Sequence, residues 1–345
     1  MWTFITRRLL YMIPILFGVL LLTYVIFFTV NDPQSVARTK LGGVKASEAQ
    51  VTEWLVVNGY AEYGPSGKKK KELAISGHGE PDEIMVKLTD IEMHSDVVLF
   101  WNYVKGLFTF NFGKDNEGRE VSEILKEGVI PSLRLVLPGF IIAQLAAIFF
   151  ALFAALYRNT KIDRTLLIAS VLMMSISPVA IILFLQKFLA NEWHYFPVCG
   201  YDDDLLNGIR FLALPTLIYV VVSLGSEIRF NRIVILDEIG QDYVRTARAK
   251  GVSQNSMLFK HVFRNSLIPF ITHWVVALPF LYLGSLLLER FFAIPGLGDL
   301  TIRAVGNSDV NVIRALVFIG TVLYMFGTLM GDVLYALADP RIKLR

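Results

Sequence analysis

A basic stretch in the second half of the chain carries the residue pattern best suited to a specific interaction, DYVRTARAKGVSQNSMLFKHVFRNSLIP. Tyr243–Lys250 contains good helix formers, and Gly251 permits a sharp turn. Either Ser253 or Asn255 can cap a second short helix that runs through Phe263. The pattern therefore predicts a basic helix-turn-helix at a membrane surface, a shape that suits docking into a groove on a partner.

Ionisable residues near membrane depth are a second set of functional candidates. Glu227 and Asp332 are expected near the cytoplasmic ends of two helices, paired with Arg229, Arg341 or a lipid headgroup. His273 is expected one turn into a helix, where it caps, packs or meets interfacial water. No second His or Cys lies at ligand spacing, so the sequence predicts no metal site.

Nucleotide chemistry is not expected in this chain. The run Gly64-Pro-Ser-Gly67-Lys68-Lys69 has the wrong spacing for a phosphate-binding loop and lacks the Ser or Thr that would hold magnesium. We therefore predict no cofactor site and no catalytic residue. Any ATP and Mg²⁺ would be bound by separate subunits.

A paired-aspartate reading belongs to a different functional class. Gly298-Asp299 and Tyr201-Asp202 mimic the signature of GxGD-type intramembrane aspartyl proteases, whose two carboxylates share a proton. Here Asp202 lies in a polar run and Asp299 is expected in an external connection rather than inside a helix. That context disfavours the protease.

The composition indicates a membrane protein. The 345 residues are 54% hydrophobic and only 18% charged, which is too apolar for an ordinary soluble domain. A net charge of +3 gives no support for a nucleic-acid partner. The single cysteine, Cys199, cannot form an intrachain disulfide.

Six apolar stretches approach the length of about 20 residues that a spanning helix needs. They are Leu9–Val30, Leu135–Tyr157, Leu166–Leu189, Phe211–Leu224 with its polar continuation, Ile268–Leu288 and Val312–Leu337. Basic residues cluster in the connections on one face, which the positive-inside rule assigns to the cytoplasm. We therefore expect six transmembrane helices with both termini cytoplasmic. Pro178 and Pro279 are expected to bend their helices where a cavity can use the freed carbonyl groups.

Three regions are expected along the chain. Residues 1–30 form the N-terminus and the first transmembrane helix, 31–130 an external domain, and 131–345 a five-helix core with a cytoplasmic loop at 230–268. The external domain holds 12 Lys and Arg against 16 Asp and Glu, a net charge of 12 − 16 = −4. Its Lys68–Lys71 run is interpreted as a solvated loop. Ser47 and Gln50 form a candidate capping box, and Ser95 is a candidate cap for a helix toward Gly106.

The basic stretch resembles the cytoplasmic "EAA" coupling loop of binding-protein-dependent ABC permeases, and in particular the B-type permease of dipeptide and oligopeptide importers. Other segments also resemble that family, including ERFFAIPGLG from Glu289 and DVLYALADPR from Asp332. The resemblance implies an all-α polytopic membrane protein with a MetI-like ABC permease fold. It also implies a set of ATPase-coupling residues, which are Tyr243, Arg245, Thr246, Ala247, Arg248, Ala249, Lys250, Gly251, His261 and Arg264.

The partners implied by the resemblance are a second homologous permease subunit, two ABC ATPase subunits, a periplasmic or lipid-anchored solute-binding protein, and membrane lipid. The implied location is the bacterial inner (plasma) membrane. Di- or oligopeptides are the expected cargo. Permeases for nickel chelates, glutathione and oligosaccharides share the same resemblance and stay open as alternatives.

Overall fold

The computed structural model describes residues 2–30, 33–41, 46–57, 59–63, 91–282 and 284–338. The chain divides into two compact units. Unit 1 comprises Met1–Leu9, Leu125–Asn307 and Ile319–Arg345, and unit 2 comprises Leu10–Ile124 and Ser308–Phe318. The predicted external domain 31–130 overlaps unit 2, and its external location stays a prediction.

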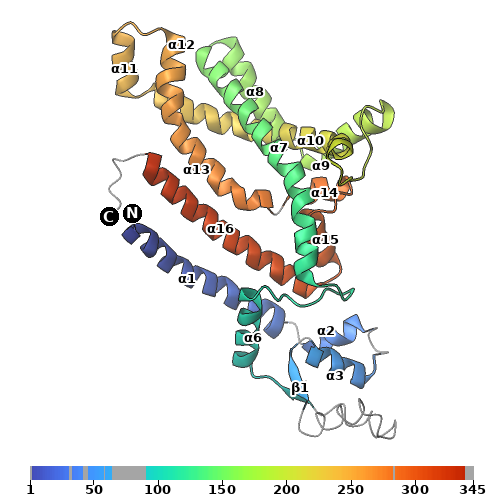
Figure 1. Ribbon diagram of the computed structural model, residues 1–345. Helices are drawn as coiled ribbons and strands as arrows, with labels where there is room; N and C mark the ends of the chain where they lie inside the picture. The colour runs from blue at the N-terminus through green and yellow to red at the C-terminus, as the bar shows by residue number, and fades with distance from the viewer. Residues whose placement is uncertain are drawn as a thin grey trace, which may run out of the picture. The chain divides into compact units, whose positions relative to one another are not determined.

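Unit 1 is built from helices (Figure 1). In chain order these are α7 (Val121–Leu156), α8 (Lys161–Ser175), α9 (Pro178–Leu185), η3 (Gln186–Glu192), α10 (Leu205–Ile239), α11 (Asp242–Ala249), α12 (Gln254–Ser256), η4 (Met257–Val262), α13 (Phe263–Tyr282), α14 (Leu286–Phe291), α15 (Leu297–Gly306) and the later part of α16 (Val310–Ala338). Elements labelled η are π-helical turns. Apolar side chains of α7, α9, α10 and α13 form one core cluster.

Small residues allow the long helices of unit 1 to approach closely. A Cβ on Gly225 of α10 would lie 2.7 Å from the carbonyl oxygen of Ser170 in α8. A Cβ on Gly139 of α7 would lie 2.8 Å from the Tyr219 ring of α10. Such small-residue contacts are typical of packing between membrane helices, where backbone proximity strengthens dispersion contacts.

Unit 2 combines short helices with one small sheet. It contains most of α1 (Trp2–Tyr24), then η1 (Val25–Val30), α2 (Pro33–Lys40), α3 (Glu48–Val57), β1 (Ala61–Tyr63), β2 (Ile91–Met93), α6 (Asp96–Phe108) and the start of α16. The strands pair antiparallel in the register Ala61↔Met93, Glu62↔Glu92, Tyr63↔Ile91.

The predicted cap positions in unit 2 are confirmed. The Ser47 backbone N–H donates to Gln50 Oε1 at 3.1 Å, and the Gln50 N–H donates to Ser47 Oγ at 3.3 Å, which is the predicted capping box. Gly59 follows α3 with a φ of +76°. Ser95 precedes α6 as predicted, although its side chain makes no capping hydrogen bond.

Among the described residues, four helices are long and apolar enough to cross a membrane. They cover Thr6–Phe28, Val121–Leu156, Asn207–Ile239 and Val310–Val333. A fifth candidate is the pair Lys161–Ser175 and Pro178–Glu192, which is bent by 92°. The all-α polytopic class is thus confirmed. The fifth predicted span, Ile268–Leu288, corresponds to α13, which does not meet the same criterion, so the count of six stays a prediction.

The bend predicted at Pro178 is confirmed, whereas the start of the second predicted span was wrong. Leu166–Leu189 is not one straight helix, because the chain leaves helical geometry before Pro178, which opens α9. The helix predicted from Leu135 begins earlier, at Val121, and passes through Pro131. Tertiary contacts within unit 1 hold this early part, since a Cβ on Gly128 would meet the Leu297 side chain at 2.9 Å.

Candidate functional site: a surface hairpin and the cavity behind it

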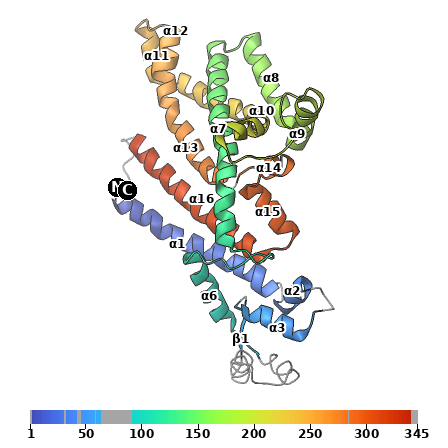
Figure 2. The same ribbon diagram turned by 45° about the vertical axis from the view of Figure 1, so that its right-hand side comes forward.

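The predicted helix-turn-helix is present as a hairpin, defined here as residues 242–264. Its first arm is α11, and its turn contains Gly251 with a φ of +78°, in the left-handed region that favours glycine. The Gly251 N–H donates to the Arg248 carbonyl at 2.9 Å. Both views place α11 and α12 at one end of unit 1, beside the connection between α7 and α8 (Figure 2).

The second arm differs from the prediction. Ser253 precedes α12 at the cap position, but its side chain makes no capping hydrogen bond. The arm does not stop as a separate helix at Phe263, because α12, η4 and α13 follow one another without a break. The predicted loop 230–268 also opens on the last turns of α10, which ends at Ile239.

Apolar side chains anchor the hairpin to the long helices. Val244 is fully buried and Ala247 is 8% exposed. They belong to α11 and lie one helical turn apart, so they share one face. Val244 packs in a core cluster with residues of α7, α10, η4 and α13. The Gln254 side chain adds a hydrogen bond from Nε2 to the Leu156 carbonyl at 3.2 Å.

Tyr243 ties the first arm to the end of α10. Its hydroxyl donates to Glu238 Oε2 at 2.5 Å. Burial and the neighbouring Glu238 carboxylate raise the pKa of Tyr243 to about 12. The phenol therefore stays protonated at physiological pH and keeps its role as donor.

The remaining predicted coupling residues form the outer surface of the hairpin. The exposed ones are Arg245, Thr246, Arg248, Ala249, Lys250, Gly251, His261 and Arg264. Arg245 lies 3.5 Å from Asp242, and both side chains are largely in solvent, so this pair contributes little stability. Arg248 Nε contacts Met257 Sδ at 3.4 Å. Of the ten predicted residues, Tyr243 and Ala247 instead belong to the anchoring face.

Behind the hairpin, α7, α10 and α13 enclose a cavity of about 230 Å³. Its wall combines apolar side chains with polar ones from α7 and α10, namely Gln144, Tyr219, Ser223 and Glu227. Glu227 pairs with His273 of α13 at 3.2 Å. This contact corrects the expectation that Glu227 pairs with Arg229, Arg341 or a headgroup, whereas the packing expected as one option for His273 is confirmed by its ring contact with Phe230.

Two further contacts complete this polar cluster. Trp274 Nε1 donates to Gln144 Oε1 at 2.9 Å, and the His273 ring stacks on Phe230 with centroids 4.2 Å apart. The side-chain atoms of Asn231, one turn beyond Glu227, are buried without a hydrogen-bond partner. Sequence reasoning missed Gln144 and Trp274. Buried polar atoms without a partner are rare in folded proteins, so Asn231 is a candidate functional position.

Asp332 is also paired differently from the prediction. It accepts a hydrogen bond from Arg8 Nη2 at 3.1 Å. Both residues belong to unit 1. The start of α1 and the later part of α16 are therefore joined by an ion pair.

Glu289 forms a second buried polar cluster in unit 1 and is fully buried. Oε1 accepts from the Ser132 hydroxyl at 2.8 Å and the Ser285 N–H at 3.1 Å. Oε2 accepts from the N–H groups of Gly298 at 2.7 Å and Asp299 at 3.1 Å. Burial raises the pKa of Glu289, and these four hydrogen bonds oppose that rise by stabilising the carboxylate.

The Glu289 cluster joins α14 and α15 to α7. Ser132 of α7 also accepts a hydrogen bond from the Leu297 N–H at 2.8 Å. Glycines make room for the carboxylate, because a Cβ on Gly284 or Gly296 would overlap its oxygen atoms. This explains why the sequence has glycine at these positions in a segment that is otherwise apolar.

The aspartates of the protease alternative are held by other groups. Contrary to the prediction, Asp299 lies inside a helix, α15. It forms ion pairs with Arg290 at 3.1 Å and Arg303 at 2.8 Å. Asp202 Oδ1 accepts from the Asp204 N–H at 3.0 Å. Asp299 is thus engaged by two arginines, an arrangement unlike the carboxylate pair that shares a proton in an aspartyl protease.

No cluster of three or more His, Cys, Asp or Glu side chains that could hold a metal ion occurs within the part of the chain that the structure describes.

Comparison with known proteins gives one consistent result. The family model for the binding-protein-dependent transport system inner membrane component matches residues 147–344. The oligopeptide transport system permease protein AppB of Bacillus subtilis is 30% identical over 99% of this chain and 100% of its own length. A putative peptide transport system permease protein of Brucella abortus is 30% identical, covering 79% and 88% of the two chains. The glutathione transport system permease protein GsiC of Salmonella typhimurium is 32% identical, covering 72% and 80%.

Proposed function

Because this chain belongs to the family of binding-protein-dependent transport system inner membrane components, we propose that it is the permease subunit of an ATP-driven peptide importer. In this role it forms half of a translocation pathway and hydrolyses no ATP itself. The observation that best supports this proposal is the hairpin 242–264. Its outer surface is basic, and its inner face is anchored to α7, α10 and α13.

The hairpin is the site we propose for ATPase docking. Arg245, Arg248 and Lys250 are exposed on the first arm and offer positive charge to an acidic groove. Motion of a docked subunit reaches α13 directly, because the second arm is continuous with that helix. Two ATPase subunits would bind the ATP and Mg²⁺, and a second permease would supply a second such hairpin.

The orientation we propose places both termini in the cytoplasm. The Arg8–Asp332 ion pair supports placing both termini on one side of the membrane, and the basic connections assign that side to the cytoplasm. With both ends on the hairpin side, a solute-binding protein would approach from the opposite, external side.

Short peptides are the proposed cargo. Support comes from the relatives in Bacillus subtilis and Brucella abortus, which are named as oligopeptide and peptide permeases. The cavity between α7, α10 and α13 carries polar groups on a largely apolar wall, which suits cargo with varied side chains. Glutathione is the second candidate, because the Salmonella typhimurium relative is a glutathione permease by name.

The test is affinity purification of the tagged chain in nanodiscs, followed by identification of its partners and an ATPase assay with and without the solute-binding protein. We expect a second permease, two ATPases, and ATP hydrolysis stimulated by the binding protein. Mass spectrometry of the ligand released from that protein separates mixed peptides from glutathione. A chain that purifies without any ATPase would refute the proposal.

A further inference from the structure

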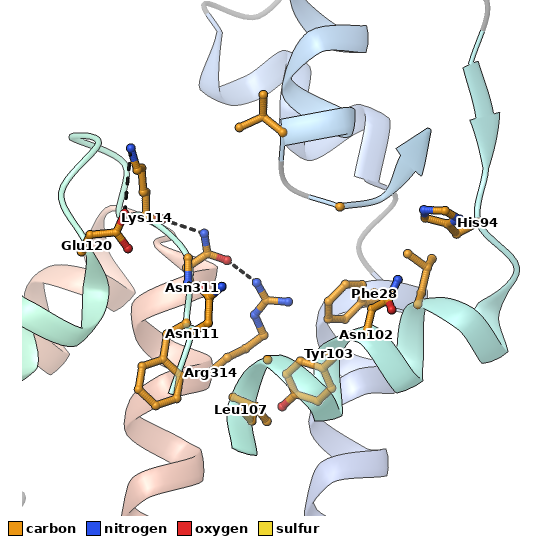
Figure 3. Close-up of a pocket in the computed structure, with 16 residues that line it drawn as sticks. Phe28, His94, Asn102, Tyr103, Leu107, Asn111, Lys114, Glu120, Asn311 and Arg314 are labelled. Carbon is orange, nitrogen blue, oxygen red and sulfur yellow. Dashed lines mark hydrogen bonds and ion pairs between the residues drawn. The ribbon is translucent and has the colours of Figure 1, made fainter. Parts of the chain in front are cut away.

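Unit 2 contains a pocket to which the proposed transport function gives no ligand. Its volume is about 530 Å³, and its lining comes from α6, the connection that follows α6, and the start of α16. Figure 3 shows the Arg314 guanidinium reaching the hollow between Asn311 and the Phe28 ring. The volume lies within the usual range for small-molecule sites, roughly 300–1,000 Å³.

Aromatic rings and an amide hold Arg314 in place. Its guanidinium carbon lies 4.7 Å from the Phe28 ring centroid and 5.6 Å from that of Tyr103. Its Nη2 donates to Asn311 Oδ1, while Asn311 Nδ2 donates to the Lys114 carbonyl at 2.7 Å. The guanidinium is therefore oriented by three neighbours, none of which carries a negative charge.

No carboxylate of the described residues forms an ion pair with Arg314. Asp309 is near enough to interact electrostatically, but Oδ2 accepts from the Asn116 N–H at 2.7 Å and Oδ1 from the Val312 N–H at 3.3 Å. Glu120, the acidic side chain of the pocket lining, lies 3.9 Å from Lys114.

The charges therefore favour an anionic ligand. With His94 neutral, the lining has a formal charge of +2 from Lys114 and Arg314 and −1 from Glu120, which gives +1. Asp309, the nearby carboxylate, accepts from backbone N–H groups and makes no ion pair with Arg314, so the guanidinium is only partly neutralised, and contacts with aromatic rings offset the remaining cost only in part. A planar carboxylate matches the two-pronged geometry of a guanidinium.

We propose that this pocket binds the carboxylate end of a short peptide, with the carboxylate at Arg314. The peptide class rests on the proposed function, whereas the anion site rests on the pocket alone. Side-chain amides of Asn102 and Asn111 also line the hollow and can pair with peptide N–H and C=O groups. The volume exceeds what a lone carboxylate requires, so the ligand has room for at least one further residue.

The experiment uses the full chain in phosphatidylcholine nanodiscs and measures binding by isothermal titration calorimetry. The probes are tetra-alanine with a free C-terminal carboxylate and the same peptide with a C-terminal amide. We expect the free carboxylate to bind roughly tenfold or more tightly, since a hydrogen bond to a charged group is worth that much. Equal binding of the two probes would overturn the proposal.

Variants test whether Arg314 is responsible for tighter binding of the free carboxylate than of the amide. Arg314→Gln should remove the preference for the free carboxylate, while Lys105→Gln, an exposed change on α6 outside the pocket lining, should leave it unchanged. Asn311→Asp offers a second route, because it places a carboxylate against Arg314 and should block the site from within while keeping that contact. If both Arg314→Gln and Asn311→Asp retain the preference, the assignment is wrong.

Further arms identify the source of the anion. Acetate that displaces tetra-alanine at equal concentration would reduce the site to a general anion site and overturn the peptide assignment. Nanodiscs containing phosphatidylglycerol should leave tetra-alanine binding unchanged, and strong competition would assign the pocket to lipid phosphate instead. The binding assay requires no ATPase. If the carboxylate preference is absent but the ATPases still co-purify, the pocket proposal fails and the transport role stands. If the preference is present but no ATPase co-purifies, the anion site stands and the transport role fails.

Discussion

Replacing Glu289 with Gln tests whether the buried carboxylate holds α14 and α15 against α7. The change keeps the shape of the side chain but turns one acceptor oxygen into a donor. If the new NH₂ group replaces Oε2, it faces the N–H groups of Gly298 and Asp299. If it replaces Oε1, the Ser132 hydroxyl can rotate to accept, but the Ser285 N–H loses its acceptor.

The second orientation is the less costly one, and it sets the magnitude. One buried N–H without a partner costs about 1–3 kcal/mol, and the remaining hydrogen bonds lose the help of the negative charge. We therefore expect a loss of about 2–4 kcal/mol in the free energy of unfolding. At about 2.1 cal/mol/K of unfolding entropy per residue, that loss corresponds to a fall of roughly 3–6 °C in melting temperature for a chain of 345 residues.

The assay is heating of the purified chain in detergent, followed by size-exclusion chromatography of the monodisperse fraction. Unfolding of membrane proteins is commonly irreversible, so wild type and variant are compared at one heating rate. Glu117→Gln is the matched control, because Glu117 is an exposed partner of Arg119 and its loss should change little. An unchanged melting temperature for Glu289→Gln would refute the structural role of the carboxylate.

Three further predictions concern the hairpin. Gly251→Pro should abolish co-purification of the ATPases, because proline cannot adopt a φ of +78° and lacks the N–H that donates to the Arg248 carbonyl, whereas Gly251→Asn should retain it; normal transport by the proline variant would contradict the coupling role. Arg248→Glu should weaken ATPase docking measured by pull-down. The difference between wild type and variant should shrink as salt is raised, because salt screens the same charge contact in the wild type; unchanged recovery of the ATPases with the variant would count against this contact. The folded-state pKa of Tyr243, about 12, exceeds the ordinary value of 10, so its contribution to stability is complete below pH 10 and falls as pH rises toward 12. Tyr243→Phe should flatten that part of the curve of melting temperature against pH, and a curve identical to wild type would show that the Glu238 contact contributes nothing.

Local signals in the sequence predicted the hairpin well. Gly251 marks the turn because few other residues adopt its backbone geometry, and Ser47 with Gln50 marks a helix start because the capping box is a contact between near neighbours. Long-range pairing was beyond such reasoning. Glu227 contacts His273 only because α10 packs against α13, and no pattern in either segment predicts the partner in the other.

The Glu289 cluster shows a related limit. The sequence placed Glu289 in a segment after the fifth predicted span, but its partners come from Ser132 and from backbone N–H groups, which have no sequence signature. The bend before Pro178 was predicted in kind, since proline disfavours helical geometry in the preceding residue. The angle of 92° could not be predicted, because tertiary packing sets the direction of the chain after the bend.

The unbroken course from α12 through η4 into α13 has a mechanical consequence. At about 1.5 Å per residue, Gln254 lies roughly 35 Å along this rod from Ala277 in the cavity wall. A stiff rod of that length converts a small tilt at its docked end into a lateral displacement at the far end. The π-helical turn η4 interrupts the α-helical hydrogen-bond pattern within this rod, and such turns are frequent at functional sites. A substitution that changes η4 would therefore alter the stroke of the proposed lever without touching the first arm of the hairpin or the cavity.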